Sequence, residues 1–361
     1  MSFFDSIGLA DMEKIHSQTI AWLFSKDCDA MSEKEKLAAL SAIISRKEIG
    51  EIFNVYTEYK NIDIVIETDN KVIAIENKVK SNQHSNQLER YKEILNEDFK
   101  TKDKVYIFLT LIPEKAESKG WENTSYELLV EALENQIIKE IETKTVDRVI
   151  ASEYIITVKR MVEVVKSFES DHRKFKNVFT DGTLKKFEKE KKKKEENYSK
   201  NQIYILNNQL ETILQKRFFN KILCEFKKRE IIQGSVSETR GNALIHISLE
   251  KRLEYNGHFF EVGYQIQNNT IKFIFQAETE SYYKSKKEWL TEDVIDKMEK
   301  LKQHMEYKKL NKPTKHAYIS ISKKLDINIW EYDFNELIDA LYSEYKKAGI
   351  HKEKLISSII Q

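Results

Sequence analysis

The stretch from Asn61 to Lys78 constrains the fold of this chain more than any other part, because it predicts a β-hairpin in a defined register. Isoleucines alternate with polar residues on both sides of the turn formers Asp69 and Asn70. These two residues are favoured at the centre of a tight hairpin turn, particularly where a positive φ is needed. Placing them there fixes which residues of the two strands face each other.

The predicted register brings two carboxylates side by side. Asp63 lies directly opposite Glu76, and Lys78 follows two residues later on the same face. Directly opposed residues have Cβ atoms roughly 4.5–5.5 Å apart, and like charges in such a pair destabilise a sheet. A divalent cation shared by the two carboxylates removes this repulsion. We therefore expect Asp63 and Glu76 to form a metal site, with Ile64 and Ile75 on the opposite, buried face.

These residues resemble the core motif of a known family. Asp63, followed after a short hairpin by Glu76-Asn77-Lys78, is similar to the Asp…Glu-x-Lys core of the PD-(D/E)XK nuclease superfamily. Ile62 stands where many members have a proline, although many others lack it too. The motif alone is a weak pattern, and its phase within the hairpin makes it specific.

Two flanking segments extend the resemblance. Gln87 and Tyr91 match the Gln-x-x-x-Tyr motif that many members carry on the next helix. Upstream, Glu13 begins a Glu-x-x-His-Ser segment that resembles the first helix of an uncharacterised bacterial subgroup. The resemblance covers residues 10–110 and does not extend to the remainder of the chain.

The resemblance implies a restriction-endonuclease-like α/β fold, in which helices flank a mixed sheet. It also implies a Mg²⁺-dependent (or Mn²⁺-dependent) endonuclease that hydrolyses phosphodiester bonds in DNA. Asp63, Glu76 and Glu13 would hold the metal. Lys78 would orient or deprotonate the attacking water, and Gln87 would contact that lysine or a phosphate. Cleavage of both strands favours a homodimer, and the subgroup suggests a role in antiviral defence against foreign DNA.

Two alternatives stay open at this point. In the first, the protein has a catalytically silent nuclease fold that only binds nucleic acid. In the second, it is a module that binds a protein partner through its C-terminal part. The intact set of Asp63, Glu76 and Lys78 argues against the first alternative. A degenerate site usually loses the lysine or one of the acids.

Composition restricts the cellular setting more than the function. The 361 residues are 33% charged, yet the net charge is only +1, so any affinity for nucleic acid has to come from local patches. The two cysteines, Cys28 and Cys224, lie far apart, which favours a reduced, cytoplasmic environment. No apolar run approaches the ~20 residues that a membrane helix needs, and the N-terminus does not resemble a signal peptide.

The composition divides the chain into three parts. Residues 1–180 are expected to form the nuclease-like domain, and residues 203–361 an α+β C-terminal domain for recognition or oligomerisation. Between them, residues 181–202 form a Lys-rich linker or helix that includes Lys191–Lys194. Such a segment is either a solvated connection or an arm that contacts phosphates.

The pattern also predicts several elements outside the hairpin. A helix over 83–96 leads to a buried strand over 104–112, which should run parallel to the second hairpin strand because a helix connects them. In the C-terminal part, apolar stripes predict single helices over 203–226 and 287–310. A second hairpin should turn at Asn268-Asn269.

Overall fold

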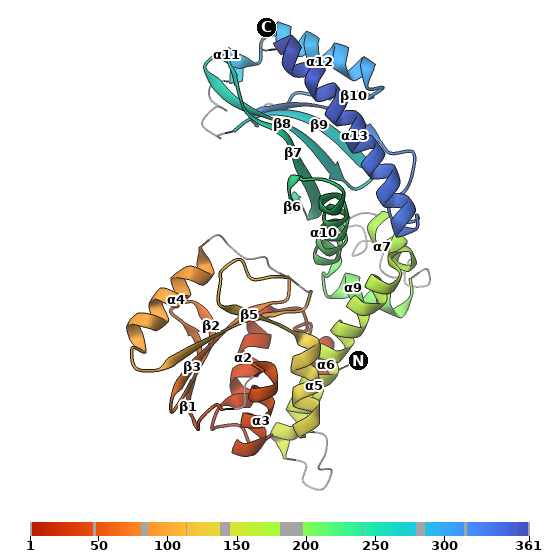
Figure 1. Ribbon diagram of the computed structural model, residues 1–361. Helices are drawn as coiled ribbons and strands as arrows, with labels where there is room; N and C mark the ends of the chain where they lie inside the picture. Colours follow the sequence, from red (N-terminus) through yellow and green to blue (C-terminus); the bar gives the residue numbers. More distant parts are fainter. Residues whose placement is uncertain are drawn as a thin grey trace. The chain divides into compact units, whose positions relative to one another are not determined.

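The chain forms two compact units, each built on its own β-sheet (Figure 1). The structure, a computed structural model, describes residues 2–45, 48–80, 86–112, 114–137, 145–180, 198–239, 241–278, 286–313 and 316–359. Most of the predicted Lys-rich segment, residues 181–197, therefore lies outside the described residues. Within the described parts, no helix combines the length and the apolar character needed to cross a membrane.

The first unit contains a five-stranded sheet and the helices around it. Its elements are α1 (Phe3–Ser6), α2 (Glu13–Phe24), α3 (Glu33–Ile43), β1 (Ile52–Tyr59), β2 (Ile62–Thr68), β3 (Lys71–Lys78), α4 (Gln87–Asp98), β4 (Asp103–Thr110), β5 (Trp121–Ser125), α5 (Tyr126–Ile137), α6 (Val146–Ser170) and α9 (Lys200–Asn207). The strand order is β1-β2-β3-β4-β5. Strand β2 is antiparallel to both β1 and β3, whereas β3, β4 and β5 run parallel to one another. The predicted mixed sheet flanked by helices is confirmed.

Helices cover both faces of this sheet (Figure 1). On one face, Leu88, Tyr91 and Leu95 of α4 pack in a buried cluster with Val65 of β2 and Ala74 of β3. On the other face, α2 packs against the first three strands, and α3, α5 and α6 pack beyond it. Only the ends of the central strands are therefore left for polar side chains.

The predicted hairpin register is confirmed. Ile64 pairs with Ile75, and the pairing continues in step toward the turn. The turn itself differs from the expectation, because neither Asp69 nor Asn70 has a positive φ. Instead, the hydroxyl of Thr68 accepts a hydrogen bond from the Lys71 N–H at 3.1 Å, which closes the loop without a left-handed residue.

The second unit contains a six-stranded antiparallel sheet. Its elements are a 3₁₀ turn η1 (His172–Phe175), α7 (Lys176–Thr180), α10 (Glu211–Arg229), β6 (Gln233–Thr239), β7 (Asn242–Tyr255), β8 (His258–Gln267), β9 (Thr270–Ala277), α11 (Lys286–Trp289), α12 (Glu292–His304), β10 (Lys309–Asn311), β11 (Tyr318–Lys324) and α13 (Phe334–Ile359). The strand order is β10-β11-β9-β8-β7-β6. The predicted turn at Asn268-Asn269 joins β8 to β9.

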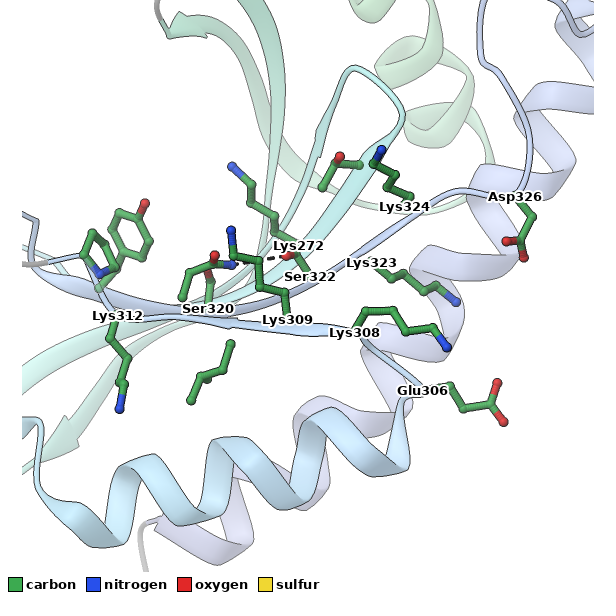
Figure 2. Close-up of a pocket in the computed structure, with 15 residues that line it drawn as sticks. Lys272, Glu306, Lys308, Lys309, Lys312, Ser320, Ser322, Lys323, Lys324 and Asp326 are labelled. Atoms are coloured by element: carbon green, nitrogen blue, oxygen red, sulfur yellow. Dashed lines mark hydrogen bonds between the residues drawn. The ribbon is translucent and has the colours of Figure 1, made fainter.

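Helices α10 and α13 pack against one face of the second sheet (Figure 1). Their buried aromatic residues meet Tyr264 of β8 and Trp330 of the connection before α13, and contact one another across the helices. At the opposite end of the strand order, β9, β10 and β11 line a groove of about 1120 Å³ (Figure 2).

Two predicted helices are wrong in extent. The stripe over 203–226 belongs to two helices, α9 and α10, because Gln209 adopts a left-handed φ of 51° between them. The stripe over 287–310 ends earlier, since α12 stops at His304 and the chain then forms strand β10. The side chain of Thr291 caps the start of α12 by accepting a hydrogen bond from Val294 N–H, which separates α12 from α11.

Candidate active site

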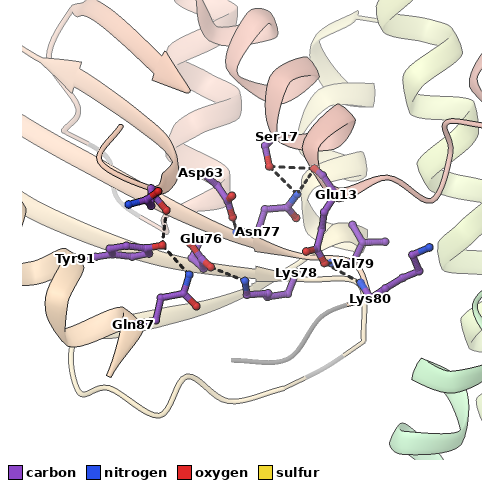
Figure 3. A network of polar contacts seen from close by, with 11 residues as sticks. Glu13, Ser17, Asp63, Glu76, Asn77, Lys78, Val79, Lys80, Gln87 and Tyr91 are labelled. Carbon is purple, nitrogen blue, oxygen red and sulfur yellow. Dashed lines mark hydrogen bonds and ion pairs between the residues drawn. The ribbon is translucent and has the colours of Figure 1, made fainter. Parts of the chain in front are cut away.

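Two carboxyl groups converge on the α4 face of the first sheet (Figure 3). Asp63 is the second residue of β2, and Glu76 lies near the end of β3. They are two residues away from Val65 and Ala74, which belong to the core under α4, and therefore lie on the same face of the sheet. Glu76 is only 1% exposed. The Asn77 N–H donates a 2.8 Å hydrogen bond to Asp63 Oδ2, which holds this carboxylate against β3.

Burial raises the pKa values of both acids, and repulsion from Asp63 adds to the effect at Glu76. Desolvation, followed by the charge of the Asp63 carboxylate, raises the pKa of Glu76 to about 8. Desolvation also raises the pKa of Asp63, although the Asn77 N–H and the charge of Lys78 act in the opposite direction. A buried acid and a partly buried acid with raised pKa values are stabilised by a shared proton or a shared cation.

The donor set of these two acids fits a hard divalent cation. Glu76 Oε2 is buried and receives no hydrogen bond from any residue that the structure describes. A buried carboxylate oxygen without a donor is unfavourable unless a proton or a metal ion occupies its lone pair. Mg²⁺ is usually bound by one or two carboxylates together with waters and substrate phosphates. Asp63 and Glu76 supply that number of oxygen ligands without a further protein group.

Glu13, the third predicted ligand, turns toward the backbone at the end of β3. Its Oε2 accepts hydrogen bonds from the N–H groups of Val79 at 2.7 Å and Lys80 at 2.9 Å. Among the described residues, no three side chains of His, Cys, Asp or Glu gather closely enough to hold a metal. Glu13 still lies near enough for its charge to raise the pKa of Asp63. Its role as a ligand stays a prediction.

Lys78 is paired with Glu76. Its Nζ lies 2.6 Å from Glu76 Oε1, and the whole residue is 8% exposed. Burial favours the neutral amine, but the charges of Glu76 and Asp63 outweigh this effect, and the pKa of Lys78 is raised. The lysine is therefore a buried cation that points into the same space as the two acids (Figure 3).

Gln87 and Tyr91 share one face of α4, as the motif predicted. Gln87 Nε2 lies 2.7 Å from the Tyr91 hydroxyl, which in turn donates to the Asn61 carbonyl just before β2. This chain of hydrogen bonds fixes the start of α4 beside the strand that carries Asp63. Contact of Gln87 with Lys78 or with a phosphate stays a prediction. The expected helix start at residue 83 lies outside the described residues.

Asn77, between the two motif residues, has a structural role that the sequence reasoning missed. Its side chain points to the opposite face of β3, where Nδ2 donates to Ser17 Oγ at 3.1 Å and Oδ1 accepts from Tyr126 hydroxyl at 2.6 Å. Asn77 is 1% exposed, so these partners satisfy a fully buried amide. The available signal was a polar residue on a strand face otherwise occupied by isoleucines.

His16, which follows Glu13 by one helical turn, belongs to the core. Its two ring nitrogens lie 2.8 Å from the Ala10 carbonyl oxygen and 3.1 Å from the Tyr154 hydroxyl. Burial lowers the pKa of His16 to about 4, so the ring is neutral at physiological pH. Both nitrogens therefore have protein partners, which leaves His16 no free position for a metal.

Glu76 makes the stability of the metal-free protein depend on pH. Its pKa of about 8 in the folded chain lies far above the ordinary value of 4.5. The folded state keeps this proton where the unfolded state has released it. The contribution of Glu76 to the free energy of unfolding should therefore be largest below pH 4.5 and decrease as the pH rises toward 8, by at most ~1.4 kcal/mol per unit.

Urea denaturation in EDTA, on either side of neutral pH, measures this dependence. Glu76→Gln removes this titrating group and should make the decrease in stability between neutral pH and pH 8 less steep than in the wild type. An equally steep decrease in Glu76→Gln would show that another group is responsible.

Comparison with known proteins gives one match. The model of the PD-(D/E)XK nuclease superfamily matches residues 1–159, a range that includes Asp63, Glu76, Lys78 and Gln87. No curated protein and no solved structure is detectably similar to the chain. The match covers most of the first unit and does not extend to the second.

Proposed function

Residues 1–159 belong to the PD-(D/E)XK nuclease superfamily, and from this we propose that the protein is a metal-dependent endonuclease that hydrolyses phosphodiester bonds in DNA. The observation that supports the proposal best is the buried group of Asp63, Glu76 and Lys78. One carboxylate oxygen of Glu76 has no hydrogen-bond partner among the described residues, and Lys78 Nζ lies 2.6 Å from the other oxygen. Such a buried oxygen is unfavourable in a site with only a structural role.

Asp63 and Glu76 are the residues that would hold Mg²⁺ or Mn²⁺, with Glu13 as a further predicted ligand. When bound, the cation supplies Lewis-acid chemistry, which polarises the scissile phosphate and lowers the pKa of water. The chain holds Asp63 ready for this task through the hydrogen bond from the Asn77 N–H. The buried position of Glu76 excludes competing water from its carboxylate.

Lys78 acts beside the two acids. Its raised pKa keeps the ammonium group protonated near neutral pH, so we assign it to orienting the attacking water and to stabilising negative charge on the phosphate. Proton removal by Lys78 would require the charge of the neighbouring acids to be neutralised first. Gln87, which donates a hydrogen bond to the Tyr91 hydroxyl, would position Lys78 or a phosphate oxygen.

Purified protein incubated with supercoiled plasmid, linear DNA or RNA tests the proposal. We expect Mg²⁺ or Mn²⁺ to support nicking and linearisation of the plasmid, and EDTA to prevent both. Conversion of closed circles identifies an endonuclease, because a closed circle has no end for an exonuclease. Linearisation without a free nicked intermediate would support action as a homodimer.

Two outcomes contradict parts of this proposal. Binding of DNA without cleavage in either metal would favour the silent, binding-only alternative. Cleavage of RNA alone would move the substrate from DNA to RNA, and would remove the proposed role in defence against foreign DNA.

A further inference from the structure

A continuous row of polar side chains crosses the second sheet on the face opposite α10 and α13. Residues that pair directly across strands share a face, and the pairing here runs through all six strands. In spatial order the row is Lys309, Ser322, Lys272, Gln265, His246 and Ser235. With neighbouring strands ~4.8 Å apart, the row is ~24 Å long. The described helices of this unit pack on the other face.

The row ends in the groove of about 1120 Å³ that β9, β10 and β11 line. Lys272, Lys309 and Lys324 point to the same side of the sheet there (Figure 2). None of the three forms an ion pair with a described residue, although ion pairs are common elsewhere in the unit, as between Lys323 and Glu344 at 2.8 Å. Lys272 is half-buried, and desolvation without a compensating acid lowers its pKa.

Ser320 adds a second, independent indication of a ligand site. It lines the groove beside these lysines, is 1% exposed, and its hydroxyl has no hydrogen-bond partner among the described residues. The neighbouring Ser322 hydroxyl, by contrast, accepts a hydrogen bond from Asn311 Nδ2 at 3.1 Å. A buried hydroxyl without a partner is unfavourable, and a ligand that accepts its hydrogen bond would remove this cost.

The charge is concentrated on one side of the edge strand β10. On the helical side, Lys323 is paired with Glu344 at 2.8 Å. On the opposite side, Lys272 and Lys309 stand among serine, threonine and asparagine residues. This side offers ammonium and hydroxyl donors, which is the chemistry that recognises phosphate oxygens.

We propose that this face of the second sheet binds the phosphate backbone of a nucleic acid, through Lys272, Lys309, Lys324 and the hydroxyl of Ser320. The choice of a nucleic acid as ligand rests on the proposed nuclease function. The spread of the three lysines over β9, β10 and β11 favours a polymer over a single phosphate. At β7 and β8 the row is bonded internally, since His246 lies 2.7 Å from Glu261 and 3.2 Å from Gln265. Polar contacts to phosphates supply affinity without reading the base sequence.

Fluorescence anisotropy of a labelled DNA duplex, titrated with the full-length protein in EDTA, tests this assignment without cleavage. The variant Lys272→Ala/Lys309→Ala/Lys324→Ala should bind at least about tenfold more weakly. Its plot of log affinity against log salt should be flatter by between about two and three units, one for each lost phosphate contact. Ser320→Ala should weaken binding severalfold without lowering the melting temperature, because the removed hydroxyl has no partner.

A matched control removes three lysines of the same unit that lie on α12 and α13 and do not line the groove. Lys297→Ala/Lys300→Ala/Lys354→Ala loses the same charge and should bind like the wild type. Equal weakening in both triple variants would overturn the assignment, because general charge would then explain the affinity. Binding at the wild-type affinity by the first triple variant would overturn the assignment as well. So would a result in which the three lysines are needed to bind inorganic phosphate but not to bind the duplex.

Cleavage assays of the same proteins separate this inference from the proposed function. A protein that binds duplex through the three lysines but never cleaves it supports the binding face and contradicts the nuclease. A protein that cleaves, and binds equally well without the three lysines, supports the nuclease and contradicts the binding face.

Discussion

Asp63→Asn should abolish plasmid cleavage while the protein stays folded. Asparagine has the same size, and its carbonyl oxygen can still accept the hydrogen bond from the Asn77 N–H. It lacks the negative charge that a divalent cation requires. The expected loss is several kcal/mol of transition-state stabilisation, which corresponds to roughly a thousandfold or more in rate. Glu76→Gln should have the same effect, because it removes the other carboxylate of the pair.

Three measurements on these variants complete the test. Single-turnover cleavage gives the rate, calorimetric titration with Mg²⁺ or Mn²⁺ gives the metal affinity, and thermal melting in EDTA reports the fold. For Asp63→Asn the melting temperature should stay the same or rise, since the variant relieves the repulsion on Glu76 and leaves the ion pair of Glu76 with Lys78 in place. Glu97→Ala, an exposed acid on α4, serves as the control and should cleave normally. Cleavage at the wild-type rate by Asp63→Asn would eliminate the proposed metal site.

Lys78→Met should reduce cleavage about a hundredfold to ten-thousandfold, the range for a group that assists proton transfer or stabilises transition-state charge. Methionine keeps a similar length and removes the ammonium group. Metal affinity should persist or increase, because the ammonium group that now lies 2.6 Å from Glu76 Oε1 no longer competes for that carboxylate. The variant therefore separates metal binding from catalysis.

The same single-turnover and calorimetric measurements apply, with Lys71→Met as the control. Lys71 begins the same strand, at the end remote from the acids, and should be dispensable. Loss of both cleavage and metal binding in Lys78→Met would contradict the assigned role. It would show that Lys78 holds the two acids in place and does not act on the water.

The hairpin and the pairing of its two acids could be predicted from the sequence, because both depend on local rules. A period of two sets the face of each residue, and a turn sets the register, so Asp63 had to meet Glu76. The parallel pairing of β3 with β4 followed from the connecting helix in the same way. Even a different turn conformation at Asp69 and Asn70 left the register unchanged.

Features that depend on distant contacts could not be predicted. The break at Gln209 leaves the run of apolar residues uninterrupted, although α9 belongs to the first unit and α10 to the second. Strand β5 has only five residues and is stabilised by its pairing with β4. The hydrogen-bond partners of Glu13 are backbone N–H groups more than sixty residues away. No pattern in the sequence indicates that the Glu13 carboxylate accepts hydrogen bonds from these groups.

Asn77 also determines how rigidly the acids are held. Its backbone N–H fixes Asp63 on one face of the sheet, while its side chain is anchored to α2 and α5 on the other. The reactive carboxylates thus take their position from the packed interior, and they have it before any substrate arrives. Such preorganisation means that the free energy of substrate binding is not consumed in ordering the acids, and remains available to lower the activation barrier.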